Sequence, residues 1–163
     1  KTIENIPGVN KSWRICEFGC GMGRNLNHLF DHDYHYLIGI DCNIRSIRIA
    51  KANNSKIRFW EGSLDVLLVQ NFDILFTVSM LDHVPNPEEY IKLFRIVSPR
   101  LILLELTLPE KGKINDPNII NFSYSHDYEQ LLKGMNYTSF PAPLAQDGFL
   151  HEYTCYVVNG GTL

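Results

Sequence analysis

Apolar residues along most of the chain form either short continuous runs or stretches in which they recur every three or four positions. The first pattern is typical of strands covered on both faces of a sheet, and the second is typical of amphipathic helices. We expect strands at residues 13–18, 36–40, 56–60, 72–78, 100–106 and 152–158. Strands that alternate with helices predict an α/β domain with a doubly wound, mostly parallel sheet, and the last segment predicts a closing antiparallel hairpin.

Helical periodicity follows the first two predicted strands. Side chains three, four or seven positions apart lie on one face of a helix, so an apolar set with this spacing marks the buried face. We expect the buried faces of these two helices to carry Met22, Leu26, Leu29, Phe30, Ile44, Ile47 and Ala50.

Capping residues predict the ends of two later helices. Asn86 and Pro87 begin the first, because Asn can cap a helix and Pro suits its first position, and Pro99 ends it. Ser125 is expected to cap a short helix that Gly134 ends. The segment 109–124 between them is expected to be a long loop, and long loops in compact domains are often functional.

Composition narrows the class of protein. The 163 residues are 45% apolar, which predicts a single domain over residues 1–163. Fifteen basic and eighteen acidic side chains give a net charge of −3, and no basic stripe is present, so we do not expect a nucleic-acid binder. No apolar run approaches the roughly 20 residues that span a bilayer, and no signal peptide opens the sequence. These patterns predict a cytoplasmic protein without a membrane segment.

The four cysteines, Cys16, Cys20, Cys42 and Cys155, lack the paired spacing of a zinc site. We expect reduced thiols and no bound metal.

Three glycines at alternate positions follow the first predicted strand, in the segment E-F-G-C-G-M-G. Gly19, Gly21 and Gly23 allow a tight turn and a close approach of the main chain to a ligand where a helix begins. A dinucleotide-binding turn has its third glycine one position later, where this chain has Arg24, so the spacing disfavours a nicotinamide-dependent oxidoreductase. Glu17 heads the segment as either a cofactor contact or a solvated strand end.

A second acidic residue follows the second predicted strand. Asp41 lies 22 residues beyond Gly19, where a carboxylate can accept hydrogen bonds from both hydroxyls of a ribose. After the third strand, Ser63 and Leu64 occupy the equivalent place, although a helix cap explains Ser63 equally well.

The glycine turn, Asp41 and the segment F-D-I-L-F-T-V-S-M-L-D-H-V at residues 72–84 together resemble class I S-adenosylmethionine-dependent methyltransferases. The resemblance implies a seven-stranded sheet and S-adenosylmethionine as cofactor. It also implies that Glu17 lies near the methionine end and that Asp41 holds the ribose. The family often places an acid on the adenine amino group after strand three, where this chain has Ser63. The residues expected to contact the cofactor are Glu17, Gly19, Gly21, Gly23, Asp41, Cys42, Ser63, Leu64 and Ser79.

The form of residues 72–84 is similar to that of methyltransferases that act on small molecules, and it lacks the Asn-Pro-Pro-aromatic of enzymes that methylate DNA bases. A weaker likeness is to methylases associated with the biosynthesis of sialic-acid-like sugars. The resemblance therefore implies methyl transfer to a small-molecule acceptor, with oxygen as the expected target atom.

Two residues are candidates for catalysis. His83 has a side chain suited to taking a proton from an acceptor hydroxyl, or it is a structural hydrogen-bonding group. Glu105 lies in an apolar strand and is either a paired buried carboxylate or, as we favour, an acid that points into the crevice. Tyr124, His126 and Tyr128 either line an acceptor pocket or form an ordinary helix start.

Other functions remain open at this point. The same cofactor turn suits an enzyme that cleaves S-adenosylmethionine or transfers an aminopropyl group from its decarboxylated form. It also suits a non-catalytic subunit that binds the cofactor. The sequence leaves a homodimer open and does not identify the acceptor.

Overall fold

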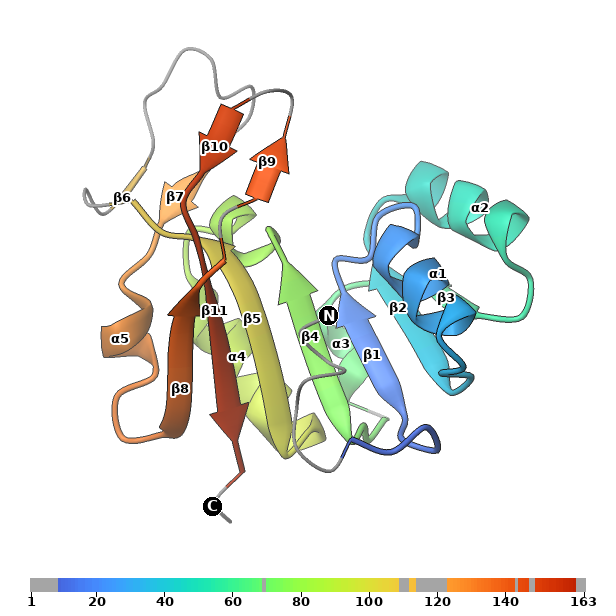
Figure 1. Cartoon of the computed structure of the whole chain (residues 1–163), viewed down its shortest axis with the longest axis horizontal. Helices are drawn as coiled ribbons and strands as arrows, with labels where there is room; N and C mark the ends of the chain where they lie inside the picture. Colours follow the sequence, from blue (N-terminus) through green and yellow to red (C-terminus); the bar gives the residue numbers. More distant parts are fainter. Residues whose placement is uncertain are drawn as a thin grey trace.

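The computed structural model describes residues 9–68, 70–108, 112–113, 123–142, 144–146 and 149–160, and its main feature is a seven-stranded sheet. The strand order is β3-β2-β1-β4-β5-β11-β8 (Figure 1). The strands of this sheet are β1 (Ile15–Phe18), β2 (Leu37–Asp41), β3 (Arg58–Glu61), β4 (Ile74–Val78), β5 (Arg100–Leu106), β8 (Asn136–Pro141) and β11 (Tyr153–Asn159). The first five run parallel, whereas β11 is antiparallel to both β5 and β8. The predicted doubly wound sheet with an antiparallel C-terminal pair is confirmed.

Helices connect the strands and cover both faces of the sheet. They are α1 (Arg24–Asp31), α2 (Ile44–Asn53), α3 (Leu64–Leu67), the 3-10 turn η2 (Leu81–His83), α4 (Pro87–Val97) and α5 (Tyr128–Leu131). Two short strand pairs complete the described chain, β6 (Gly112–Lys113) with β7 (Tyr124–Ser125) and β9 (Leu144–Gln146) with β10 (Phe149–His151). Within these ranges, no helix combines the length and apolarity that crossing a membrane requires.

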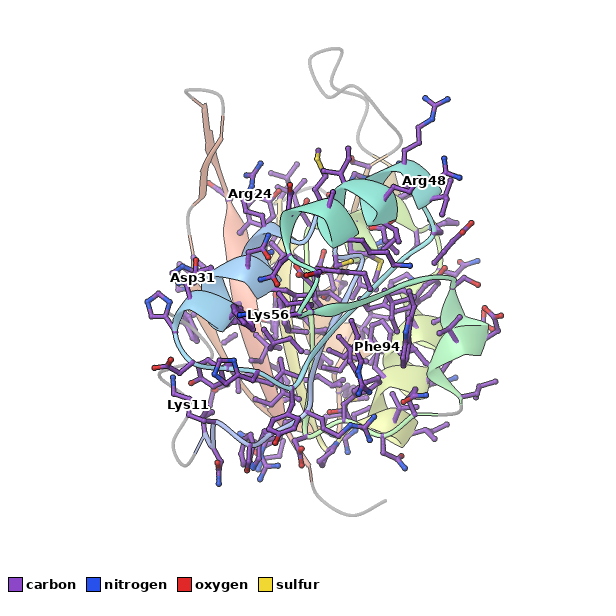
Figure 2. The ribbon with its side chains drawn as sticks, turned by 90° about the vertical axis from the view of Figure 1, so that its right-hand side faces the viewer. Lys11, Arg24, Asp31, Arg48, Lys56 and Phe94 are labelled. Atoms are coloured by element: carbon purple, nitrogen blue, oxygen red, sulfur yellow. The ribbon has the colours of Figure 1, made fainter. Side chains whose placement is uncertain are left out.

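The core consists of two apolar layers, one on each face of the sheet. Leu26 and Leu29 of α1 and Ile47 and Ala50 of α2 pack on the face that carries Ile15. The opposite layer contains Cys16 of β1 and side chains of three helices, Leu67, Ile91, Phe94, Val97 and Tyr128. Figure 2 shows Phe94 and Asp31 on opposite sides of the sheet. β1, β2, β4 and β5 are therefore covered on both faces, which explains their apolar sequences. The parallel strand β3 lies at the edge of the sheet, and Arg58 and Glu61 at its ends are exposed.

Two residues expected on buried helical faces lie outside the core. Met22 is 53% exposed because Gly23, in the left-handed conformation at φ 77°, is the N-cap of α1, so the helix begins after Met22. Ile44 is the first residue of α2, next to the N-cap Asn43, and is also exposed. The apolar spacing therefore continues beyond the start of α1 at Met22, and it extends to the exposed first residue of α2 at Ile44.

The predicted cap of α5 is wrong by two residues. Ser125 belongs to β7, and the carboxylate of Asp127 instead accepts the main-chain N–H of Gln130 at 3.1 Å. For α4, Asn86 and Pro87 occupy the predicted cap and first position, although the Asn86 side chain makes no capping hydrogen bond. Much of the predicted loop 109–124 lies outside the described residues; within it, residues 112–113 and 124 belong to β6 and β7.

Candidate functional site

The carboxyl ends of β1, β2, β3 and β4 surround a cleft of about 320 Å³. Its lining residues are Phe18, Gly19, Asp41, Cys42, Gly62, Ser63, Ser79, Met80, His83, Val84 and Tyr90. Six residues predicted from the sequence thus meet at one place, namely Gly19, Asp41, Cys42, Ser63, Ser79 and His83. This is the position at which open α/β sheets bind ligands.

The three glycines of the turn have different roles. All have positive φ angles, 78° at Gly19, 52° at Gly21 and 77° at Gly23. A Cβ atom on Gly19 would lie 2.3 Å from Cγ of Met80, and one on Gly23 would lie 2.7 Å from the ring of Phe59. A Cβ on Gly21 would meet no described atom within 4 Å. Packing within the protein therefore requires Gly19 and Gly23, whereas Gly21 faces open space that a ligand can enter.

Two main-chain N–H groups hold the Asp41 carboxylate in place. Its Oδ2 accepts the N–H of Gly21 at 2.8 Å, and its Oδ1 accepts the N–H of Asn43 at 2.8 Å. Each carboxylate oxygen has a further lone pair. The side chain is therefore fixed in orientation and can still accept hydrogen bonds from a ligand.

Glu17 lies below the glycine turn and is almost fully buried. Its Oε1 accepts a hydrogen bond from Nδ2 of Asn25 at 2.6 Å, while its Oε2 has no partner among the described residues. Burial raises the pKa of Glu17 to about 8, and the Asn25 hydrogen bond partly opposes that shift. A buried carboxyl with a free oxygen suits a nearby cationic ligand group, which would restore its charge.

Glu105 lies beneath the cleft rather than in it, contrary to the orientation favoured from the sequence. It is fully buried and is not a lining residue. Its Oε1 accepts the hydroxyl hydrogen of Thr77 at 2.6 Å, and its Oε2 accepts the N–H groups of Met80 at 3.1 Å and Leu81 at 3.0 Å. Burial, followed by the nearby charge of Asp82, raises the pKa of Glu105 to about 8. Hydrogen bonds from the main-chain N–H groups at the start of η2 explain why an acid lies in this apolar strand. The sequence does not reveal these partners.

The turn after β4 brings His83 to the cleft. Ser79 has a φ of 49°, which is unusual for a residue other than glycine, and such positions cluster at functional sites. Its hydroxyl is 3.3 Å from Oδ2 of Asp82 and 3.0 Å from the hydroxyl of Tyr153. Asp82 is buried, and burial raises its pKa. The exposed His83 side chain therefore projects from a turn whose buried side contacts Asp82 and Glu105.

His126, which directly follows β7, supports the same turn. Its Nε2 is 3.0 Å from the carbonyl oxygen of Leu81 and 2.9 Å from that of Val84, so Nε2 carries a hydrogen and donates to them. Tyr124 stacks on the His126 ring, and Tyr128 is buried against Tyr156. None of Tyr124, His126 and Tyr128 lines the cleft, so the structure gives these residues a supporting position.

Several cleft residues were not predicted. Tyr90 reaches the cleft from the first turn of α4, and Phe18, Gly62, Met80 and Val84 complete its walls. An aromatic residue in the first turn of the helix after the L-D-H-V segment is the signal that would have identified Tyr90. One predicted contact is elsewhere, because Leu64 packs against the core. Ser63 lines the cleft, and its hydroxyl donates to Asp65 at 2.8 Å.

The cleft fits S-adenosylmethionine in three respects. Asp41 offers free lone pairs for a ribose, Gly21 leaves room for close approach, and Glu17 has an unpartnered buried oxygen for a cation. Phe18 and Tyr90 add aromatic walls to the cleft. In the described part of the chain, no three His, Cys, Asp or Glu side chains are grouped as metal ligands.

Comparison with known proteins identifies the family. The family described as "Methyltransferase domain" matches residues 15–100, which include the glycine turn, Asp41 and His83. No curated protein sequence matches the chain.

Three solved structures share the fold. TehB from Haemophilus influenzae is 13% identical with a TM-score of 0.73, over 98% of this chain and 62% of that one. The chain thus spans less than two thirds of the length of TehB. An S-adenosylmethionine-dependent methyltransferase from Mesorhizobium loti is 13% identical with a TM-score of 0.69, over 97% and 96% of the two chains. The N-terminal domain of EvdMO1, solved with SAH bound, is 15% identical with a TM-score of 0.68, over 99% and 78%.

The match to the family covers more than half of the chain, and it includes the turn and the acid that build the cleft. The fold of the solved structures agrees with it. The chain therefore belongs to the methyltransferase domain family.

Proposed function

We propose that this chain methylates a hydroxyl oxygen of a small molecule and that His83 takes the proton released by the acceptor. The observation that carries this proposal is the position of His83. Its side chain lines the cleft from η2, the turn that Glu105 fixes through the N–H groups of Met80 and Leu81. An imidazole titrates near neutrality and suits a general base.

S-adenosylmethionine, which we propose as the cofactor, would supply a methyl group that is already activated by a sulfonium. Asp41 would hold the ribose hydroxyls, and Glu17 would face the positively charged methionine end. Gly19, Gly21 and Gly23 shape the turn beside the cofactor. Cys42, Ser63 and Ser79, which line the cleft, make further cofactor contacts. Positioning supplies much of the acceleration, because alignment of the acceptor with the methyl group removes an entropic barrier.

In the transfer, the acceptor oxygen forms a bond to the methyl carbon as the bond from that carbon to sulfur breaks. The proton of the acceptor passes to the His83 imidazole and from there to water. Glu105 acts as a positioning residue, because its carboxyl reaches only Thr77 and the main chain of the turn.

The lining of the cleft beside His83 favours a small acceptor with an apolar part. Met80 and Val84 form apolar walls there. The net charge of −3 and the absence of a basic stripe in the sequence are unfavourable for a nucleic-acid substrate.

The test is product analysis with methyl-labelled S-adenosylmethionine and a fractionated pool of cellular metabolites. We expect S-adenosylhomocysteine together with a labelled methyl ether or ester, and slower turnover by Asp41→Ala at a cofactor concentration that does not saturate it. A labelled N-methyl product would contradict the choice of oxygen. Cleavage of the cofactor without a methylated product, or binding without turnover across the pool, would contradict methyl transfer.

A further inference from the structure

A second pocket lies at the opposite end of the sheet from the cleft, beside the amino ends of β1, β2 and β3. It has a volume of about 240 Å³ and is lined by Arg14, His35, Tyr36, Leu37, Ile38, Lys56 and Arg58. We infer that this pocket, here called the basic pocket, binds the phosphate group of a nucleotide whose base stacks on Tyr36. The inference is independent of the proposed methyl acceptor.

The connection between β3 and β4 is short, and this leaves the basic pocket uncovered. The chain passes from β3 to β4 through α3, a single turn of four residues that packs against α4. Arg58 pairs in register with Ile38, so the two side chains stand on the same face of the sheet. Tyr36 precedes Ile38 by two positions and is 59% exposed. The single turn of α3 therefore leaves the amino ends of β2 and β3 accessible.

The charge of the basic pocket is not neutralised by its own walls. Three permanent cations line it, Arg14, Lys56 and Arg58, and no carboxylate does. Nη2 of Arg14 donates to Oε1 of Gln70 at 3.0 Å, a neutral partner that orients the guanidinium without cancelling its charge. Asp73 accepts the main-chain N–H of Arg14 at 2.8 Å and is not one of the lining residues. In the described ranges these cations form no salt bridge, although the chain as a whole is acidic.

Two arginines that line one pocket favour phosphate over other anions. The guanidinium group is planar and binds phosphate oxygens through two parallel hydrogen bonds. Arg14 precedes β1 and Arg58 begins β3, so they approach the pocket from two sides with β2 between them. A bound phosphate would thus be held from both sides.

Tyr36 extends this site from phosphate to nucleotide. Its exposed ring lines the pocket between the two arginines, and an aromatic face beside cationic side chains is the arrangement that binds a base next to its phosphate. The neighbouring His35 is fixed by an edge contact with Phe30, with ring centroids 5.0 Å apart. The volume of 240 Å³ accommodates the phosphate and sugar, which leaves the base over Tyr36 at the rim.

The experiment is calorimetric titration of the full chain with uridine 5′-monophosphate at low ionic strength, with and without saturating S-adenosylhomocysteine. We expect equal binding in both conditions. Arg58→Gln should weaken binding about tenfold or more, the range for a lost hydrogen bond to a charged group. Arg48→Gln is the matched control, because it removes the same charge from an exposed site on α2 that Figure 2 shows well away from Lys56.

A second variant separates the base from the phosphate. Tyr36→Ala should weaken uridine monophosphate about fivefold or more and leave inorganic phosphate unchanged. Equal losses in Arg58→Gln and Arg48→Gln would overturn the site, since they would indicate general charge attraction. Displacement of the nucleotide by S-adenosylhomocysteine would assign the binding to the cleft instead. No binding of either probe at millimolar concentration would also overturn it, whatever the cofactor experiments show.

Discussion

The carboxylate of Asp41 accepts the main-chain N–H of Gly21 at 2.8 Å, and this hydrogen bond joins the end of β2 to the middle of the glycine turn. A second hydrogen bond, from the N–H of Asn43, fixes the other carboxylate oxygen. One side chain therefore shapes the cleft and offers lone pairs to its ligand. Experiments can distinguish these two roles. The hydrogen bonds to the main chain affect the stability of the protein, and the free lone pairs affect its affinity for the ligand.

Asp41→Ala should weaken S-adenosylhomocysteine binding by about 1.5 to 3 kcal/mol, as expected for lost hydrogen bonds to a charged group. The measurement is isothermal calorimetry, and the melting temperature reports the separate loss of the bond to Gly21. Asp31→Ala, an exposed acid at the end of α1, is the control. Parental affinity in Asp41→Ala would show that the ribose assignment is wrong.

Gly21→Val should abolish cofactor binding at a modest cost in stability. Gly134 is a matched control, because it also has a positive φ, 83° against 52°, and a Cβ there would also meet no described atom within 4 Å. Both valines should lower the free energy of unfolding by at least about 1–2 kcal/mol through backbone strain. Only Gly21→Val should lose cofactor binding in calorimetry. Equal affinities in the two variants would exclude close approach of the ligand to Gly21.

Cofactor binding should release a proton from Glu17. Burial raises the pKa of Glu17 to about 8 in the free protein, so the carboxyl is mostly protonated at pH 7. A cationic ligand group beside it favours the charged form and lowers that pKa. Titrations with S-adenosylmethionine at pH 7 in buffers of different ionisation enthalpy should show close to one released proton, and Glu17→Gln should remove it. Identical proton release in both proteins would place the titrating group elsewhere.

Glu105 should make the protein less stable as the pH rises. Burial raises its pKa to about 8 from an ordinary value of 4.5, so between these values the folded state binds more protons than the unfolded state. The free energy of unfolding therefore falls with increasing pH, by up to about 1.4 kcal/mol per pH unit from this one group. Glu105→Gln should flatten the dependence in urea unfolding from pH 5 to 8, while exposed Glu129→Gln should not. An unchanged slope in Glu105→Gln would refute the assignment.

His83→Ala should lower the methylation rate on the order of a hundredfold, because general-base assistance is typically worth 10²–10⁴. Affinity for S-adenosylhomocysteine and the melting temperature should change little, since His83 is exposed. The deciding measurement is the rate against pH, with His28→Ala on α1 as the control. If His83→Ala keeps the parental profile, positioning alone accounts for the transfer.

The sequence predicted the parallel strands and the glycine turn because their signals are local. Four of the five parallel strands are apolar runs, and the turn needs residues such as Gly23 that tolerate a positive φ. Its acidic partner Asp41 was found because the length of one strand-helix unit is nearly constant. These features depend little on the rest of the chain.

The features that the sequence did not predict depend on contacts between residues that are far apart along the chain. Glu105 was assigned to the cleft because its hydrogen-bond partners, the N–H groups of Met80 and Leu81, are about 25 positions away. Tyr90 was not predicted as a cleft residue, because only the orientation of α4 in the fold brings it to the cleft. The apolar residue Met22 fits a helical period, but the N-cap at Gly23 excludes it from the helix.

The strand order has a consequence for biosynthesis. β11 is the last strand of the sheet along the chain, yet it lies between β5 and β8. Until residues 153–159 have left the ribosome, Leu103 of β5 and Ser139 of β8 lack the partner that both find in Tyr156. The nascent domain therefore carries two unpaired strand edges during translation, and such edges are prone to aggregation. We expect this sheet to close as one late event that begins with the final strand rather than growing in step with synthesis.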